Sequence, residues 1–337
     1  MISENDQQDF EIVYDNNDDS DLSVLKLQNY FLPVLYSITC ISGVFGNLLV
    51  IIIYSFYEKM KTLTDILIVN LAVADMLFLC TLPFLAYHAA NTWIFGEVMC
   101  KLIRGVYRIN LYTSMLTLTC ITLDRYISIT QAIKASRYQS NKYRWGKFIC
   151  AIAWAFSVLL AVPQFKYSQS THGCFEKYHE PYLELLVNSL QIVIGFLLPL
   201  IAIIFCYTLI VKTLIITSNF QKQKSFKIIF TVVLVFVTTQ LPYNTVIFIS
   251  VLENNLHTNI HVKIAMIVTE AIAYLHACLN PVLYFFVGIK FRKNFWKILN
   301  HWGLVKQQME HLDNIRTIER DSKNMSASTN IEAISMH

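Results

Sequence analysis

The sequence predicts an all-α membrane protein, a bundle of seven transmembrane helices followed by a short amphipathic eighth helix. Two observations carry this prediction. Of the 337 residues, 55% are hydrophobic and only 15% are charged, whereas soluble chains carry nearer 25% charge. The charged residues also gather in short clusters between apolar runs. The length of these runs is close to that needed for a helix to cross a bilayer, about 20 residues.

Six of these apolar runs predict membrane spans directly. One of them, Ile66–Ala90, holds a single charged residue, Asp75. The other five contain no Asp, Glu, Lys or Arg, and they are Leu27–Tyr57, Phe148–Phe165, Leu185–Val211, Ile228–Leu252 and Ala271–Ile289.

The third span, expected at Ile109–Leu123, is weaker by hydropathy alone. Its 15 residues are uncharged, but Arg104 and Arg108 precede it and Asp124-Arg125 follows it. Lys and Arg side chains near a helix end can reach the membrane surface, so these charges are compatible with a span. A crossing here is also required to keep the basic loops on one side of the membrane.

Lys and Arg placement predicts the orientation. The loops after spans one, three, five and seven are rich in Lys and Arg, so we expect an extracellular N-terminus and a cytoplasmic C-terminus in the plasma membrane. The net charge of +4 then reflects topology and indicates no nucleic-acid partner. The expected parts are an acidic segment 1–29, the bundle 30–288, a membrane-surface helix 289–300 and a cytoplasmic tail 301–337.

The two ends of the chain carry candidate modification sites. Residues before Lys26 are strongly acidic, and Tyr14 beside Asp15 suits sulfation. Such a segment is either a solvated tail or a segment that attracts a basic protein ligand electrostatically and so raises its encounter rate. The tail is either an inert linker or a phosphorylated partner site; its candidate phosphorylation sites are Ser326, Ser328, Thr329 and Ser335.

Cysteine placement predicts one disulfide. Six of the eight cysteines lie within apolar spans, where they act as small apolar side chains. Cys100 and Cys174 are both expected on the extracellular side, which is oxidising, so we predict that they are bonded to each other.

Ionisable residues inside a membrane are costly and usually functional. Asp75 is either a protonated, hydrogen-bonded carboxyl or part of a sodium site, because hard cations prefer oxygen ligands. The further oxygen-bearing side chains expected at the same depth are Asn110, Ser114 and Asn280.

Two further charged sites stand near the span ends. Asp124-Arg125 at the cytoplasmic end of span three either caps the helix or forms a two-state switch. Glu270 lies about three turns from Pro281 toward the outside, where it is a candidate counter-ion for a cationic ligand group. The sequence shows no zinc-type His/Glu spacing, phosphate loop or Gly-x-Ser-x-Gly motif, so no enzyme activity is predicted.

An ordered set of motifs resembles the rhodopsin-like G-protein-coupled receptors. The set comprises Gly46-Asn47, Leu71-Ala-Val-Ala-Asp75, Cys100, Asp124-Arg125-Tyr126, Trp154, Pro199, Tyr207, Phe236, Leu241-Pro242-Tyr243, Asn280-Pro281-Val282-Leu283-Tyr284 and Phe291-Arg292. In that resemblance the activation switch involves Asp124, Arg125, Tyr126, Tyr207, Phe236, Gln240, Pro242, Pro281 and Tyr284. Gln240 departs from the family, most of which has tryptophan at this position.

Within that class the chain is similar to chemokine receptors, and there to the type-6 CXC branch. The likeness to chemokine receptors rests on Thr81-Leu82-Pro83, Trp93, Tyr107, Glu270 and His276-Ala-Cys278-Leu-Asn280. The likeness to the type-6 branch rests on the stretches Phe220–Phe230, Val268–Tyr274, Phe291–Lys297 and Met325–Ser328. The ligand-binding residues that the resemblance implies in the bundle are Glu270, Tyr107, Trp93 and His88. Tyr14 and Asp15 of the acidic N-terminal segment complete the expected set.

The resemblance implies a receptor for a basic CXC chemokine, in particular the membrane-tethered ligand of the type-6 branch. The partners that it implies in the cytosol are an inhibitory-type heterotrimeric G protein, arrestin and a receptor kinase, with membrane lipids around the bundle. A non-signalling scavenger or adhesion receptor, including a virally captured copy, is the alternative. A transporter is disfavoured because the sequence has no internal repeat.

Overall fold

The computed structural model describes residues 26–58, 60, 62–130, 142–170, 173–217, 220–252, 260–287 and 289–301. The expected sites at Tyr14, Asp15, Ser326, Ser328, Thr329 and Ser335 lie outside these ranges. The chain divides into two units, Met1–Leu283 and Tyr284–His337, and each is described by itself.

The described chain is almost entirely helical. The elements in order are η1 (Leu27–Phe31), α2 (Leu32–Ile52), η2 (Ile53–Tyr57), α3 (Leu63–Leu79), α4 (Leu82–Ala90), α5 (Gly96–Thr130), α7 (Lys142–Leu160), α8 (Val162–Tyr167), β1 (Ser168–Ser170), β2 (Cys174–Glu176), α9 (Pro181–Ile192), η4 (Val193–Leu197), α10 (Leu198–Thr217), α11 (Phe220–Leu252), α12 (Ile260–Tyr274), α13 (His276–Val287) and α14 (Ile289–His301).

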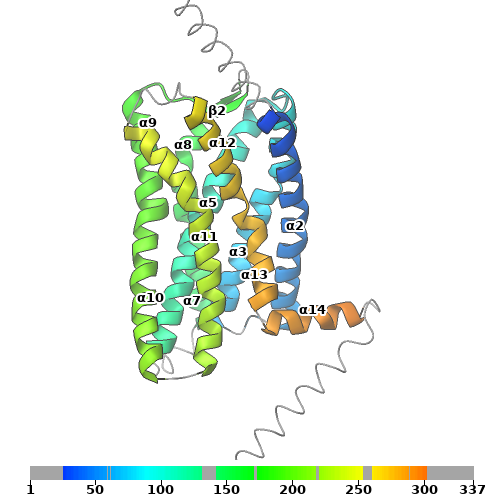
Figure 1. The fold of residues 1–337 in the computed structure, drawn as a ribbon, viewed down its shortest axis with the longest axis vertical. Coiled ribbons are helices and arrows are strands. Elements are labelled where there is room, and N and C mark those ends of the chain that lie inside the picture. Colours follow the sequence, from blue (N-terminus) through cyan, green and yellow to red (C-terminus); the bar gives the residue numbers. More distant parts are fainter. Residues whose placement is uncertain are drawn as a thin grey trace, which may run out of the picture. The chain divides into compact units, whose positions relative to one another are not determined.

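The long helices of the first unit form a bundle, and α5 lies between other helices of this bundle (Figure 1). Helix α5 contacts α3, α7, α10 and α11, while α2 packs on α3, α4 and α12. The central position of α5 explains its low hydropathy, because much of its surface faces other helices instead of lipid. Buried polar side chains along it include Asn110, Thr113, Ser114, Thr117 and Thr122.

Six helical segments of the described chain are long and apolar enough to cross a membrane, and α5 is not one of them. Helix α5 nevertheless has 35 residues, about 50 Å of helix at 1.5 Å per residue, against a hydrocarbon layer of about 30 Å. This division matches the sequence prediction. Hydropathy identifies six spans directly but does not identify span three, which corresponds to α5. Together they form the seven-transmembrane bundle.

Local sequence sets where the helices begin and bend. Thr62 and Asp65 cap α3 reciprocally: the Asp65 N–H donates to Thr62 Oγ1 at 3.1 Å, and the Thr62 N–H donates to Asp65 Oδ2 at 2.8 Å. Pro83 occupies the first turn of α4, where its missing N–H is tolerated. Pro242 and Pro281 lie inside α11 and α13, where each removes a backbone hydrogen bond.

A glycine allows close packing between the first and last spans. A β-carbon added at Gly46 would lie 2.7 Å from Cβ of Pro281, so a larger residue would force the helices apart. The Gly46-Asn47 pair of the sequence motif thus has a packing role, and Nδ2 of Asn47 donates to the carbonyl of Ala277 at 2.8 Å. In the second unit, α14 covers the residues 289–300 expected to form the amphipathic helix, with Phe291 and Ile298 buried and Lys297 exposed.

Candidate functional site: two cavities and a polar core

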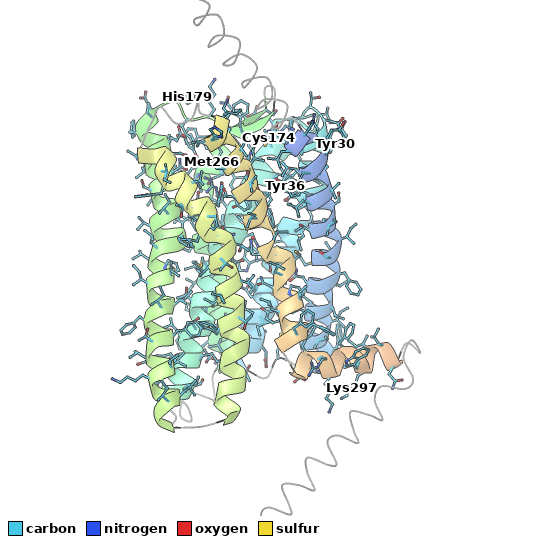
Figure 2. All side chains as sticks on the ribbon, in the orientation of Figure 1. Tyr30, Tyr36, Cys174, His179, Met266 and Lys297 are labelled. Carbon is cyan, nitrogen blue, oxygen red and sulfur yellow. A yellow bond between two sulfur atoms is a disulfide. The ribbon has the colours of Figure 1, made fainter. Side chains whose placement is uncertain are left out.

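A disulfide defines one end of the bundle, called the disulfide end here. Cys100 in α5 and Cys174 in β2 are bonded, as predicted, with 5.4 Å between their Cα atoms. Strands β1 and β2 pair antiparallel, with Ser170 opposite Cys174 and Ser168 opposite Glu176. The bond therefore fixes this hairpin, and Glu176 with it, to the first turns of α5. Figure 2 shows Tyr36, Cys174 and Met266 gathered at this end.

A cavity of about 460 Å³, called the main cavity, lies at the disulfide end. Its lining combines polar groups with a few apolar side chains: Gln28, Asn29, Leu32, Tyr36, Leu85, His88, Ala89, Ala90, Asn91, Thr92, Arg104, Ile267, Glu270 and Tyr274. The cavity thus brings together two of the residues that the sequence predicts for ligand binding, Glu270 and His88.

Glu270 is held between two neighbours inside the bundle. Its Oε1 atom lies 3.3 Å from Nη1 of Arg104, and it also accepts a hydrogen bond of 2.6 Å from the Tyr274 hydroxyl. Nη2 of Arg104 donates to the carbonyl of Cys174 at 2.9 Å. The predicted counter-ion is therefore already paired with a cation of the protein itself, and this pair links α5, α12 and the disulfide hairpin.

A second, smaller cavity of about 220 Å³, called the arginine cavity, lies at the same end. Its lining residues are Arg104, Arg108, Glu176, Tyr178, Glu184, Asn188, Tyr243, Ile247, Ser250, Met266 and Glu270. Nη2 of Arg108 lies 3.3 Å from Oε1 of Glu176. The other carboxylate oxygen, Oε2, accepts a hydrogen bond of 2.6 Å from the Tyr178 hydroxyl.

Electrostatics in the arginine cavity favour an ionised Glu176. Burial alone would raise the pKa of this carboxyl, but Arg108 and Arg104, with the Tyr178 hydrogen bond, hold it below the ordinary value of 4.5. Burial and the adjacent carboxylate raise the pKa of Tyr178, so its hydroxyl stays a donor.

This group was not predicted as a site from the sequence, where Arg104 and Arg108 stand out only as charges at the edge of a span. Their spacing of four residues places them on one face of α5, and that signal could have identified them. Glu176 could not have been placed from spacing, because its position depends on the fold of the hairpin.

Two other predicted ligand residues do not line either cavity. Tyr107 is buried, with its ring 4.8 Å from that of Tyr274, so it supports the wall that Tyr274 forms. Trp93 donates from Nε1 to the carbonyl of Gly96 at 2.9 Å, and its ring lies 5.3 Å from that of His88, edge to face. Trp93 therefore contacts a cavity residue without lining the cavity.

The candidate sodium residues meet in the middle of the bundle. Asn110 Nδ2 donates to Oδ1 of Asp75 at 3.0 Å, and Asn280 Nδ2 donates to Oδ2 at 2.8 Å. Ser114 Oγ lies 3.5 Å from the same Asn110 nitrogen. All four side chains are almost completely buried. The structure thus brings together four residues from three spans that the sequence grouped by depth.

Several of the predicted switch residues make contacts that the structure describes. Phe236 is fully buried, with its ring 5.1 Å from that of His276. Asp124 accepts a hydrogen bond of 2.8 Å from Thr64 of α3. The ring of Tyr207 lies 5.4 Å from that of Phe230. In the second unit, the rings of Tyr284 and Phe291 are 6.4 Å apart.

Comparison with known proteins agrees with this architecture. Residues 46–284 match the family described as 7 transmembrane receptor (rhodopsin family). The chain is 41% identical to human C-C chemokine receptor type 6 over 300 residues, which is 85% of this chain and 80% of that protein. Its identity to human C-C chemokine receptor type 7 is 38% over 322 residues, 91% and 85% of the two chains.

A third relative, mouse C-C chemokine receptor type 9, is 37% identical over 299 residues, 85% of this chain and 81% of that protein. These relatives carry C-C names, so the predicted CXC subtype stays a prediction while the predicted family is confirmed. The chain is a multi-pass membrane protein that belongs to the chemokine receptors of the rhodopsin family.

Proposed function

We propose that this receptor binds a basic chemokine at the extracellular surface of the plasma membrane and activates an inhibitory-type heterotrimeric G protein in the cytosol. One observation carries the ligand side of the proposal. Glu270, a carboxylate within the bundle, faces a 460 Å³ cavity at the disulfide end. A cationic N-terminus of a protein ligand has the charge to bind there.

The acidic first segment supplies the other half of ligand recognition. It carries eight Asp and Glu residues and no Lys or Arg before Lys26. This charge attracts a basic protein and raises its encounter rate. Sulfation of Tyr14 next to Asp15 adds to the same field. The ligand is bound and released without chemical change.

Signalling follows from preferential binding to one of two bundle arrangements. A ligand that binds the active arrangement more tightly shifts a pre-existing equilibrium toward it. Pro242 is the point about which α11 pivots, and Arg125, Tyr207 and Tyr284 rearrange to admit the G protein. Receptor kinase and arrestin then act on the tail, where Ser326, Ser328, Thr329 and Ser335 are the candidate phosphate acceptors.

The polar core supports a sodium ion as a regulator of this equilibrium. The donor set would fit a hard cation through the carboxylate of Asp75 and the hydroxyl of Ser114. The amide oxygens of Asn110 and Asn280 would join them once these two amide groups, whose nitrogens face Asp75 here, rotate. Oδ1 of Asn280 is buried and accepts no hydrogen bond from any described residue. A cation would provide the partner that this oxygen lacks.

Chemokine-stimulated nucleotide exchange tests the proposal. The full receptor, in lipid nanodiscs with a purified inhibitory-type G protein, is exposed to panels of CXC and C-C chemokines. Sequence motifs favour the CXC class and the similar proteins carry C-C names, so both panels are needed. Exchange above the ligand-free rate with at least one chemokine supports the function. Binding without exchange by any G protein class would instead indicate a scavenger.

A further inference from the structure

Two arginines stand one helical turn apart at the disulfide end of α5. Arg104 and Arg108 lie on the same helix face because residues four apart share a face. Only 25% of the Arg104 side chain and 7% of the Arg108 side chain are exposed. A buried guanidinium is stable only with an anionic or strongly polar partner, so the partners of these two groups decide what the site can bind.

Their present partners leave hydrogen-bonding capacity unused. Arginine usually binds a carboxylate through two parallel hydrogen bonds, but each arginine here has one contact of 3.3 Å to a glutamate. Nε of Arg104 and Nη1 of Arg108 are buried and have no acceptor among the described residues. The second oxygen of Glu176 is occupied by Tyr178. Each guanidinium can therefore donate to a further carboxylate.

Space for that carboxylate exists beside them. Arg104 and Glu270 line both the main cavity and the arginine cavity, so their ion pair lies on the boundary between the two. The arginine cavity has a volume of about 220 Å³, roughly that of seven water molecules at about 30 Å³ each. A single Asp or Glu side chain fits this volume.

Charge balance connects the two cavities. A cationic ligand group that binds Glu270 competes with Arg104 for the same carboxylate. If the ligand brought only that cation, Arg104 would be left buried without an anion, which is costly. A ligand carboxylate that replaces Glu270 as the partner of Arg104 removes this cost. It also gives Nη1 of Arg108 an acceptor.

We propose that the ligand segment entering this receptor is zwitterionic. Its cationic group binds Glu270 from the main cavity, and an Asp or Glu side chain on the same segment binds Arg104 and Arg108 in the arginine cavity. This inference rests on the proposed function and specifies its ligand class. The exchange breaks the Arg104–Glu270 pair and forms one ion pair on each side, so the charge of the site stays balanced.

The nearby carboxylates are compatible with this exchange. Glu176 remains paired with Arg108 and Tyr178, which leaves the other nitrogen of Arg108 for the ligand. Glu184 is exposed, so water screens its repulsion. Glu270 faces the ligand cation instead of Arg104.

A ligand–receptor double-mutant cycle tests the proposal. The probes are four forms of the chemokine that gives the strongest exchange in the panel above, identical from its first cysteine onward. The segment before that cysteine carries a free amine with one Asp, the amine with Asn in place of Asp, an acetylated amine with Asp, or an acetylated amine with Asn. Dissociation constants are measured on the full receptor in nanodiscs.

With the intact receptor, changing Asp to Asn should weaken binding of the free-amine form about tenfold, as for loss of a hydrogen bond between charged groups. In the Arg108→Gln receptor the same change should cost less than twofold. In the Arg104→Gln receptor the free-amine form with Asn should bind more tightly than it binds the intact receptor, because it no longer competes with an arginine.

Lys101→Gln is the matched control. Lys101 precedes Arg104 by one turn on α5, pairs with Glu97 and lines neither cavity, so this variant should keep the tenfold effect. The fully neutral probe should bind the Arg108→Gln and intact receptors equally if the variant is folded. If that variant does not reach the membrane, Arg108→Lys replaces it, and a reduced effect of Asp is expected.

Two results would overturn the inference. An equal effect of Asp→Asn on the intact and Arg108→Gln receptors would show that the ligand carboxylate does not bind Arg108. An absence of any effect would show that the ligand needs no carboxylate. Either result with normal nucleotide exchange leaves the proposed function intact, whereas a receptor that binds no chemokine overturns both.

Discussion

Nε2 of Gln240 lies 3.2 Å from Nδ1 of His276 and donates to the Ala273 carbonyl at 3.0 Å. The side chain thus ties α11 to the turn between α12 and α13. On the other side of the imidazole, Nε2 lies 3.1 Å from Oδ1 of Asn110, and Nδ2 of the same asparagine donates to Asp75. A series of polar contacts therefore connects position 240 to the candidate sodium residues.

Replacing Gln240 by leucine should destabilise the receptor. Leucine has a similar size but cannot donate, so the Ala273 carbonyl keeps only its contact with Nδ1 of His276, and the loss of one buried hydrogen bond costs about 0.5–1.5 kcal/mol. The expected result is a lower melting temperature of the purified receptor in detergent. Thr238→Val is the control, because Thr238 is exposed and, within the described ranges, bonds only to carbonyls of its own helix. Equal melting temperatures for Gln240→Leu and the control would show that the link contributes no stability.

Replacing Glu270 by glutamine should weaken signalling more than it reduces the amount of receptor at the cell surface. Glutamine keeps the shape but removes the charge that the ligand cation needs, so potency should fall about 10- to 100-fold. Dose–response curves for nucleotide exchange and surface labelling measure the two effects. Glu97→Gln is the control, because Glu97 pairs only with Lys101 among the described residues. A parallel loss of expression and potency in Glu270→Gln would indicate a folding role instead.

Most of the fold could be predicted because the bilayer imposes simple rules. A spanning helix must be long and apolar, and five spans have no charged residue at all. Hydropathy alone does not identify helix α5 as a span, because other helices surround it and much of its surface can be polar. Polar residues on it, such as Asn110 and Thr117, form hydrogen bonds with side chains of α3, and only topology and the charge distribution identified the span.

The site could be predicted less completely. Asp75 and Glu270 stand out because a carboxylate within a span is unusual. The partners of Glu270 do not stand out: Arg104 looked like a membrane-surface charge, and Glu176 lies in a hairpin whose place is fixed by the disulfide. Such pairings join residues 68 or more positions apart, and spacing along one helix carries no information about them.

The Glu176–Arg108 pair should make stability depend on pH in the acidic range. The pKa of Glu176 is held below its ordinary value of 4.5. The ion pair therefore contributes its full stabilisation of the fold above about pH 4.5. This contribution is lost as the pH falls through the lowered pKa. Glu176→Gln leaves Arg108 buried without its carboxylate and should cost about 3–5 kcal/mol at neutral pH.

Melting temperatures of both forms between pH 7 and pH 3 check this prediction. The gap between wild type and Glu176→Gln should be constant down to about pH 5 and should narrow below it. Glu184→Gln serves as the control, since Glu184 is exposed and should give no gap. A gap for Glu176→Gln that stays unchanged at pH 3 would mean that the carboxylate does not stabilise the fold through its charge.

Sodium should stabilise the ligand-free receptor through Asp75. An ion that binds only the folded state adds RT ln(1 + [Na⁺]/Kd), about 1.4 kcal/mol at ten times Kd. Replacing potassium by sodium at constant ionic strength should therefore raise the melting temperature of the wild type. Asp75→Asn keeps the size and polarity of the side chain but removes the charge, so it should abolish the sodium effect. Ser114→Ala removes one neutral oxygen and should reduce the effect, whereas an undiminished effect in Asp75→Asn would place the ion elsewhere.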